Sequence, residues 1–131
     1  MNRITPYITK LETKEIFVFG SNLSGRHGKG AAKTAMNFGA KYGQASGLQG
    51  NTYAIPTVAE NISRSLSIEE IKPYVDRFIR FARDNDDLIF LVTEIGCGLA
   101  GFKPDAIAPL FKNAIEIDNI YLPFKFWKLL R

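Results

Sequence analysis

Two short apolar runs constrain the fold of this chain more than any other feature. Ile16–Phe19 and Leu88–Val92 consist of strand-forming residues without polar alternation, which is typical of strands buried on both faces of a parallel sheet. Each run leads into a glycine-rich window. Eight of the eleven glycines lie between Gly20 and Gly50, and the other three lie at Gly96, Gly98 and Gly101. Because each window also precedes a predicted helix, the order strand, glycine window, helix occurs twice.

The rest of the chain continues this alternation. Helices are predicted from Gly30 to about Tyr42, after a capping box at Ser67 and Glu70, and from Pro104 onward. Pro73 should either kink the second helix or mark where its regular part starts, and Pro109 should bend the third. Further short strands are expected at 52–55, ended by Pro56, and at 120–122, whereas 43–51 is expected to be loop. This pattern predicts an α/β fold whose parallel or mixed sheet has helices on both faces and the 88–92 strand near its centre.

Size and composition predict one globular domain spanning residues 1–131. The 46% hydrophobic and 23% charged residues are ordinary globular values, and no apolar run approaches the roughly 20 residues that span a bilayer. A single cysteine excludes an internal disulfide, and without a signal-like N-terminus it favours a reducing, cytoplasmic compartment. One histidine excludes a metal site built on a histidine cluster. We therefore predict no metal and no cofactor.

The net charge of +4 coincides with the first glycine window. Residues 21–59 contain no Asp or Glu but carry Arg26, Lys29, Lys33 and Lys41, while the remaining 13 basic and 13 acidic residues cancel. Glycine lets backbone N–H groups approach a ligand, and the cations supply an attractive field, so the combination indicates an anion site. The alternative is a solvated basic face beside ordinary turn glycines. Because ligands of α/β sheets bind at the carboxyl ends of strands, we expect both windows to meet there around a diphosphate.

Individual residues in the windows leave two readings open. Residues 25–30 match neither a Walker A loop nor the dinucleotide fingerprint. His27 is a candidate acid/base or phosphate contact, or a loop histidine without a role. Cys97 is a candidate nucleophile, or a small residue packed in a turn, which we prefer. Asn22 could hold a ribose hydroxyl or end a strand. Glu94 could orient water or a sugar hydroxyl, or pair with one of the cations of the first glycine window.

The C-terminal segment alternates aromatic and basic residues between Phe124 and Arg131. Such interleaving is a pattern of nucleic-acid binding, which predicts a strongly salt-dependent interaction. The competing interpretation is that the aromatic side chains pack on the core. We favour the second, because a small-anion site already accounts for the net charge.

Three segments together resemble a macro domain, and more narrowly a small bacterial and phage group of macro-domain-like proteins. They are residues 16–23, residues 28–32 and residues 95–102, with residues 47–50 and 53–57 between them. The resemblance covers about residues 15–123. It implies a three-layer α/β/α fold with a mixed, largely parallel sheet, and a cleft that binds ADP-ribose or a related nucleotide, with hydrolysis of ADP-ribosyl or ADP-ribose-phosphate linkages in some members.

The resemblance also implies roles for single residues. Asn22 matches the asparagine that contacts the distal ribose, Gly28 and Gly30 the first glycine turn, and Phe102 the aromatic residue flanking that ribose. No Gly-Asp-Ile segment supplies the adenine-reading aspartate, and Ala100 stands where one subgroup has a catalytic aspartate. Catalysis, with Asn22 and His27 as candidates, is therefore left open beside a non-catalytic sensing module. The expected ligand-binding residues are Gly20, Ser21, Asn22, Gly25, Arg26, Gly28, Lys29, Gly30, Gly96, Cys97, Gly98, Leu99, Ala100, Gly101 and Phe102.

Overall fold

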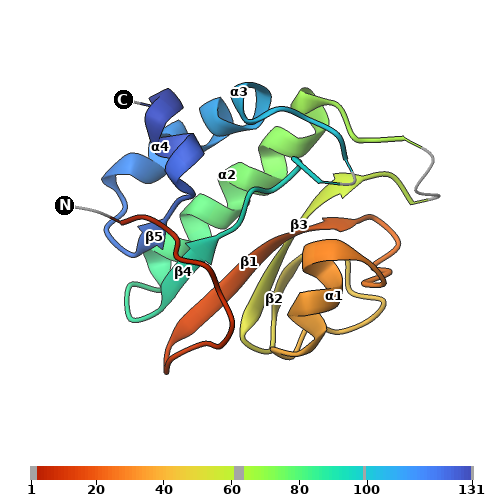
Figure 1. Ribbon diagram of the computed structural model, residues 1–131, viewed down its shortest axis with the longest axis horizontal. Helices are drawn as coiled ribbons and strands as arrows, with labels where there is room; N and C mark the ends of the chain where they lie inside the picture. The colour runs from red at the N-terminus through yellow and green to blue at the C-terminus, as the bar shows by residue number, and fades with distance from the viewer. Residues whose placement is uncertain (1–2, 61–63, 99, 131) are drawn as a thin grey trace.

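The computed structural model describes residues 3–60, 64–98 and 100–130, and its centre is one five-stranded sheet. The strand order is β2-β3-β1-β4-β5 (Figure 1). β1 (Glu15–Asn22) is the middle strand, with β3 (Thr52–Val58) and β4 (Ile89–Val92) parallel to it on either side. β5 (Ile120–Tyr121) extends the parallel part, and β2 (Gly47–Gln49) is antiparallel to β3. The predicted mixed, largely parallel sheet is confirmed.

Helices cover both faces of this sheet, so the α/β/α layering is also confirmed (Figure 1). Alternation along β1 sends Ile16 and Val18 into the larger core cluster, which they share with α2 (Ile68–Asp84). Phe17 and Phe19 enter a smaller cluster on the other face, under α1 (Gly30–Met36). α3 (Pro104–Ile107), the 3₁₀ helix η1 (Ala108–Glu116) and α4 (Phe124–Leu130) contribute side chains to the larger cluster.

Helix starts were predicted better than helix ends. The capping box of Ser67 and Glu70 is present at the start of α2, and Pro104 occupies the first turn of α3. α1, however, ends at Met36 and not near Tyr42. Gly39 has a φ of +102°, and the bonds Ala40 N to Ala35 O and Gly39 N to Met36 O close a Schellman motif around it. The helix therefore stops one turn before Gly43.

Three strand predictions need correction. The central strand is β1, and β4 lies between it and β5. The predicted loop at 43–51 contains β2, which forms a hairpin with β3. β3 also continues through Pro56 to Val58, and the register shift between Ser21 and Asn22 lies beside that proline. A proline, which lacks an N–H donor, is tolerated in a sheet at such irregularities.

The segment before β1 closes on the other end of the described chain. Ile4 forms an isolated parallel bridge with Leu122, and the indole Nε1 of Trp127 donates to the carbonyl of Arg3 at 2.7 Å. The buried Arg3 guanidinium donates to the carbonyls of Ile115, Ile117 and Ile120, and it lies 5.2 Å from the centre of the Trp127 ring. Of the helices in the described part of the chain, none has the length and apolarity to cross a membrane.

Candidate ligand-binding site

The two glycine windows meet around a cavity of about 600 Å³ at the carboxyl ends of β1, β3 and β4. The Cβ of an alanine at Gly20 would lie 3.5 Å from the backbone nitrogen of Gly96, so the ends of the windows are in contact. The predicted meeting of the windows at one sheet edge is thereby confirmed. The cavity is lined by Gly20, Ser21, Asn22, Arg26, Gly28, Lys29, Gly30, Ala31, Ala32, Tyr42, Thr57, Val58, Thr93, Glu94, Ile95, Gly96, Cys97, Gly98 and Ala100.

Most of the expected ligand-binding residues line this cavity, and a few do not. Gly25, His27, Gly101 and Phe102 are absent from the lining, and Leu99 lies outside the described residues. Phe102 instead packs against the larger core cluster, where its ring would contact a Cβ placed on Gly96. Sequence analysis missed Tyr42. The available signal was that Tyr42 lies in the segment 21–59, which contains no Asp or Glu, but the predicted helix extended to about this residue.

The side chain of Asn22 organises the first loop, residues 23–29 between β1 and α1. Its Oδ1 accepts hydrogen bonds from the Ser24 hydroxyl at 2.7 Å and from the Arg26 N–H at 2.9 Å. Its Nδ2 donates to the Arg26 carbonyl at 2.8 Å. The side chain is nearly buried, and both hydrogen bonds that Oδ1 accepts come from residues of the loop. Asn22 therefore shapes the loop that carries Arg26, as well as lining the cavity.

His27 lies beneath the loop and outside the cavity lining, which does not favour its predicted role in proton transfer. It is 2% exposed, and its ring meets Phe19 edge-on at 5.2 Å between ring centres. Its Nε2 lies 3.0 Å from Gln49 Oε1. Because that amide oxygen is an acceptor, Nε2 is the donor, and Nδ1 has no hydrogen-bond partner among the described residues. The geometry is that of a buried structural histidine.

The second loop is a tight turn held from two sides. Gly96 has a φ of +79°, and an added Cβ would lie 2.9 Å from Ile107 Cδ1, so the turn requires glycine. The Phe102 N–H donates to the Gly96 carbonyl at 2.8 Å. From the outside, the Ser65 hydroxyl donates to the Ala100 carbonyl. The second loop is therefore fastened to the core and to the segment that leads into α2.

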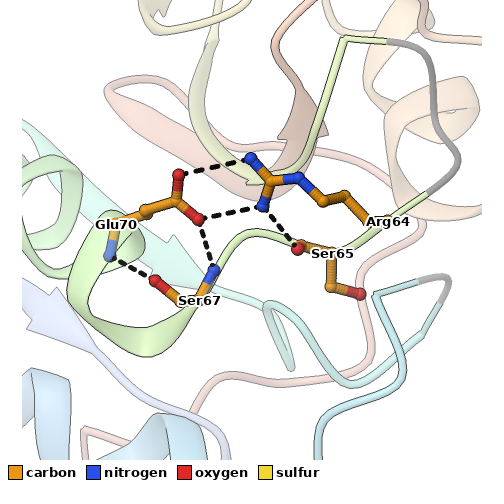
Figure 2. A network of polar contacts seen from close by, with 4 residues as sticks. All are labelled: Arg64, Ser65, Ser67 and Glu70. Atoms are coloured by element: carbon orange, nitrogen blue, oxygen red, sulfur yellow. Dashed lines mark hydrogen bonds and ion pairs between the residues drawn. The ribbon is translucent and has the colours of Figure 1, made fainter.

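That segment is itself held by a charged network at the start of α2 (Figure 2). Arg64 Nη1 donates to Glu70 Oε1 at 3.0 Å, and the Ser67 N–H donates to the same oxygen at 2.8 Å. The Glu70 N–H in turn donates to Ser67 Oγ at 3.1 Å. The hydrogen bond from Arg64, followed by the one from Ser67, lowers the pKa of Glu70 from 4.5 to about 2.

Charge is distributed unevenly around the cavity. Arg26 and Lys29 are exposed, and neither forms an ion pair with another described residue. Glu94 is the one carboxylate among the described lining residues, and its Oε1 lies 3.8 Å from Lys125 Nζ. Burial raises the pKa of the Cys97 thiol, the negative charge of Glu94 raises it further, and Lys125 opposes them. A raised pKa disfavours the thiolate, so the packing interpretation of Cys97 fits the site better than the nucleophile.

In the described part of the chain, no group of three or more His, Cys, Asp and Glu side chains is placed to hold a metal ion.

No family model matches this sequence, and comparisons with curated proteins and with solved structures likewise give no match. What the structure shows is an α/β fold with one cavity lined by residues of both glycine windows.

Proposed function

We propose that this chain binds ADP-ribose or a related nucleotide diphosphate in the cavity between its two glycine-rich loops. The observation that carries the proposal is the meeting of the loops, 66 residues apart in sequence, around one cavity flanked by Arg26 and Lys29. Loops rich in glycine expose backbone N–H groups, and two unpaired cations complement a dianionic group. A cavity of about 600 Å³ lies within the roughly 300–1,000 Å³ typical of small-molecule sites.

The resemblance to macro domains supports the ADP-ribose part of the proposal. Asn22, Gly28, Gly30 and the turn at Gly96 match that pattern, and all of them line the cavity. The aspartate that reads adenine has no counterpart in this chain, so we extend the proposal to related nucleotide diphosphates. We also propose a cytoplasmic location, because the free Cys97 fits a reducing compartment.

Titration calorimetry with ADP-ribose tests the proposal, and the basic segment supplies matched controls. Arg26 and Lys29 line the cavity, whereas the nearby Lys33 and Lys41 do not. We expect Arg26→Met and Lys29→Met each to weaken binding by roughly 3- to 10-fold, because each removes one charge from a diphosphate in a partly solvated site. Lys33→Met and Lys41→Met should stay within about twofold of wild type.

Two results would overturn the proposal. Absence of heat with ADP-ribose, ADP and pyrophosphate at millimolar concentration would remove the diphosphate site. Equal losses in all four lysine and arginine variants would show that the affinity reflects only the general positive charge of the segment.

A hydrolytic version of the same site would use Glu94 rather than His27 as the proton acceptor. Glu94 faces the cavity, while His27 is buried beneath the loop. In that version the carboxylate takes a proton from the water that attacks the ADP-ribosyl linkage, and the leaving group is protonated from solvent. Glu94→Gln should then abolish turnover and retain binding. Binding by the wild type without turnover of ADP-ribosylated protein or ADP-ribose phosphate assigns a non-catalytic sensing module.

The nucleic-acid alternative is weakened by the packing of α4. Phe126 and Trp127 are buried in the core and are not available to stack on bases. Lys125 is engaged with Glu94 at 3.8 Å. The expectation that the C-terminal aromatic residues pack on the core is met by Phe126 and Trp127, whereas Phe124 is 54% exposed. A steep salt dependence of nucleic-acid binding that disappears on neutralising Lys125 and Lys128 would restore the alternative.

A further inference from the structure

Tyr42 is the one aromatic side chain among the described residues that line the cavity. Its side chain is 64% exposed, and the neighbouring Lys41 and Gly43 are exposed as well. Phe102, which was expected to contact the ligand, is partly buried, packs against the core cluster and does not line the cavity. The cavity therefore offers a single aromatic ring, and this ring comes from a loop that no predicted motif included.

The loop that carries Tyr42 is held in place from below. Gln49 is buried, and its Oε1 accepts from the Lys41 N–H at 2.8 Å and from His27 Nε2 at 3.0 Å. The same side chain donates from Nε2 to the Gln44 carbonyl at 3.1 Å. The buried Gln49 amide is thus hydrogen-bonded to Lys41, just before Tyr42, and to Gln44, just after it. The backbone that presents Tyr42 is consequently fixed before any ligand arrives.

The loop that carries Tyr42 is also hydrogen-bonded to the first loop, which carries Arg26 and Lys29. The Gly43 N–H donates to the Gly25 carbonyl at 2.8 Å, and a Cβ on Gly25 would lie only 2.4 Å from the Gly43 carbonyl carbon. Between the two loops, the buried His27 ring lies 6.4 Å from the Tyr42 ring at an angle of 69°. His27 and Gln49 therefore act as positioning residues. They hold the exposed Tyr42 ring in the cavity lining that also contains Arg26 and Lys29.

We infer that Tyr42 stacks on the nucleobase of the bound nucleotide, so that the site recognises a diphosphate joined to a planar aromatic ring. The inference rests on the proposed function, and it adds the residue that contacts the base of the nucleotide. Every base presents a face that can stack on an aromatic side chain, and this contact tolerates different bases. We expect purine nucleotides to bind more tightly than pyrimidine nucleotides, because a larger ring system covers more of the tyrosine.

The test compares three variants by titration calorimetry with ADP-ribose and with inorganic pyrophosphate, which has no base. Tyr42→Ala should weaken ADP-ribose binding by roughly 10-fold or more and leave pyrophosphate binding within about twofold. Tyr42→Phe keeps the ring and should bind as the wild type does. Tyr7→Ala is the matched control, because Tyr7 is 93% exposed and lies outside the cavity lining. Thermal unfolding of each variant verifies that the fold is intact.

Each alternative outcome overturns a different statement. If Tyr42→Ala binds ADP-ribose normally, the stacking inference is wrong and the diphosphate site stands. If Tyr42→Ala loses pyrophosphate and ADP-ribose equally, the tyrosine supports the loop and does not stack. If the wild type binds neither compound, the proposed function fails, and the inference fails with it.

Discussion

At the scale of single residues, burial and two neighbouring charges of opposite sign set the pKa of the Cys97 thiol. Cys97 is partly buried, and its Sγ lies 3.6 Å from the Ile95 carbonyl oxygen. Burial raises the pKa of the thiol most, and Glu94 and Lys125 then act in opposite directions. These two side chains also form an ion pair with each other, so a change in either one alters the field at the sulfur.

This arrangement predicts how fast Cys97 reacts with iodoacetamide near pH 7.5. Glu94→Gln removes a negative charge, which lowers the pKa of the thiol, and should speed alkylation by roughly two- to threefold. Lys125→Met removes the opposing positive charge and should slow it. Intact-protein mass spectrometry measures both rates, since Cys97 is the only cysteine. Glu12→Gln is the control, because Glu12 pairs with Lys10 instead. Equal rates in all variants would contradict the assigned causes.

Residue roles were the part of the site that the sequence predicted least well. Asn22 and most of the predicted glycines line the cavity as expected, whereas Gly25 and Gly101 do not; the correct placements follow from the ends of strands. The burial of His27 depends on Gln49, which is 22 residues away and belongs to a strand that was expected to be loop. The orientation of Phe102 depends on the left-handed turn at Gly96. Side-chain directions in loops follow from such tertiary contacts, which spacing along the sequence does not contain.

At the scale of elements, the start of α2 combines a capping box with an ion pair (Figure 2). The motif was predictable because both of its hydrogen bonds join residues three apart. Arg64 was not predictable, since it approaches Glu70 only after the preceding segment folds back on β3. That return is visible in the antiparallel bridge between Val58 and Ser65. The network therefore links the helix start to the segment that supports the second loop.

The lowered pKa of Glu70 predicts acid-sensitive stability. The carboxyl pKa is about 2 in the folded chain and 4.5 ordinarily, so the stabilising contribution is complete above about pH 4.5. It should be lost progressively as the pH falls from 4.5 towards 2. Glu70→Gln should remove this part of the pH dependence, and Arg64→Met should remove most of it. Thermal unfolding across this pH range measures the effect. Parallel profiles for wild type and Glu70→Gln would contradict the prediction.

Element boundaries differed from expectation where backbone conformation outweighed side-chain pattern. The helical spacing of apolar residues continues past Met36, but the Schellman motif at Gly39 ends α1 there. Similarly, β3 continues through Pro56, which lies where the register between β1 and β3 shifts, and proline is tolerated in a sheet at such irregularities. Both cases involve a residue with unusual backbone properties, whose effect depends on its structural surroundings.

At the scale of the whole molecule, Arg3 joins the first described residue to the far edge of the fold. Its buried guanidinium carries no carboxylate partner among the described residues and is surrounded by the carbonyls of Ile115, Ile117 and Ile120. Two of these carbonyls belong to the end of η1, where the backbone oxygens lack intrahelical partners. One side chain therefore satisfies the last turn of η1 and fixes the position of β5.

Replacing Arg3 should destabilise the protein as a whole. Arg3→Met removes the hydrogen bonds to the carbonyls of Ile115, Ile117 and Ile120, of which that of Ile117 still accepts from the Ile120 N–H at 3.1 Å. We expect a loss of about 2–4 kcal/mol in the free energy of unfolding. Arg3→Lys retains the charge and should recover part of this loss. Lys10→Met is the control, because Lys10 has only a surface ion pair at 3.6 Å and should cost less than about 0.5 kcal/mol. Urea denaturation measures all three, and equal midpoints for Arg3→Met and Lys10→Met would contradict the assignment.

The contacts of Arg3 also bear on how the chain reaches its native state during synthesis. The bonds to Ile117 and Ile120 join residues 114 and 117 positions apart, and the bond from Trp127 spans 124. During translation, the partners of Arg3 leave the ribosome only after nearly all of the described chain has been made. The segment before β1 therefore lacks its contacts with β5 and α4 during most of elongation. These contacts can form only at the end of the synthesis of the described chain.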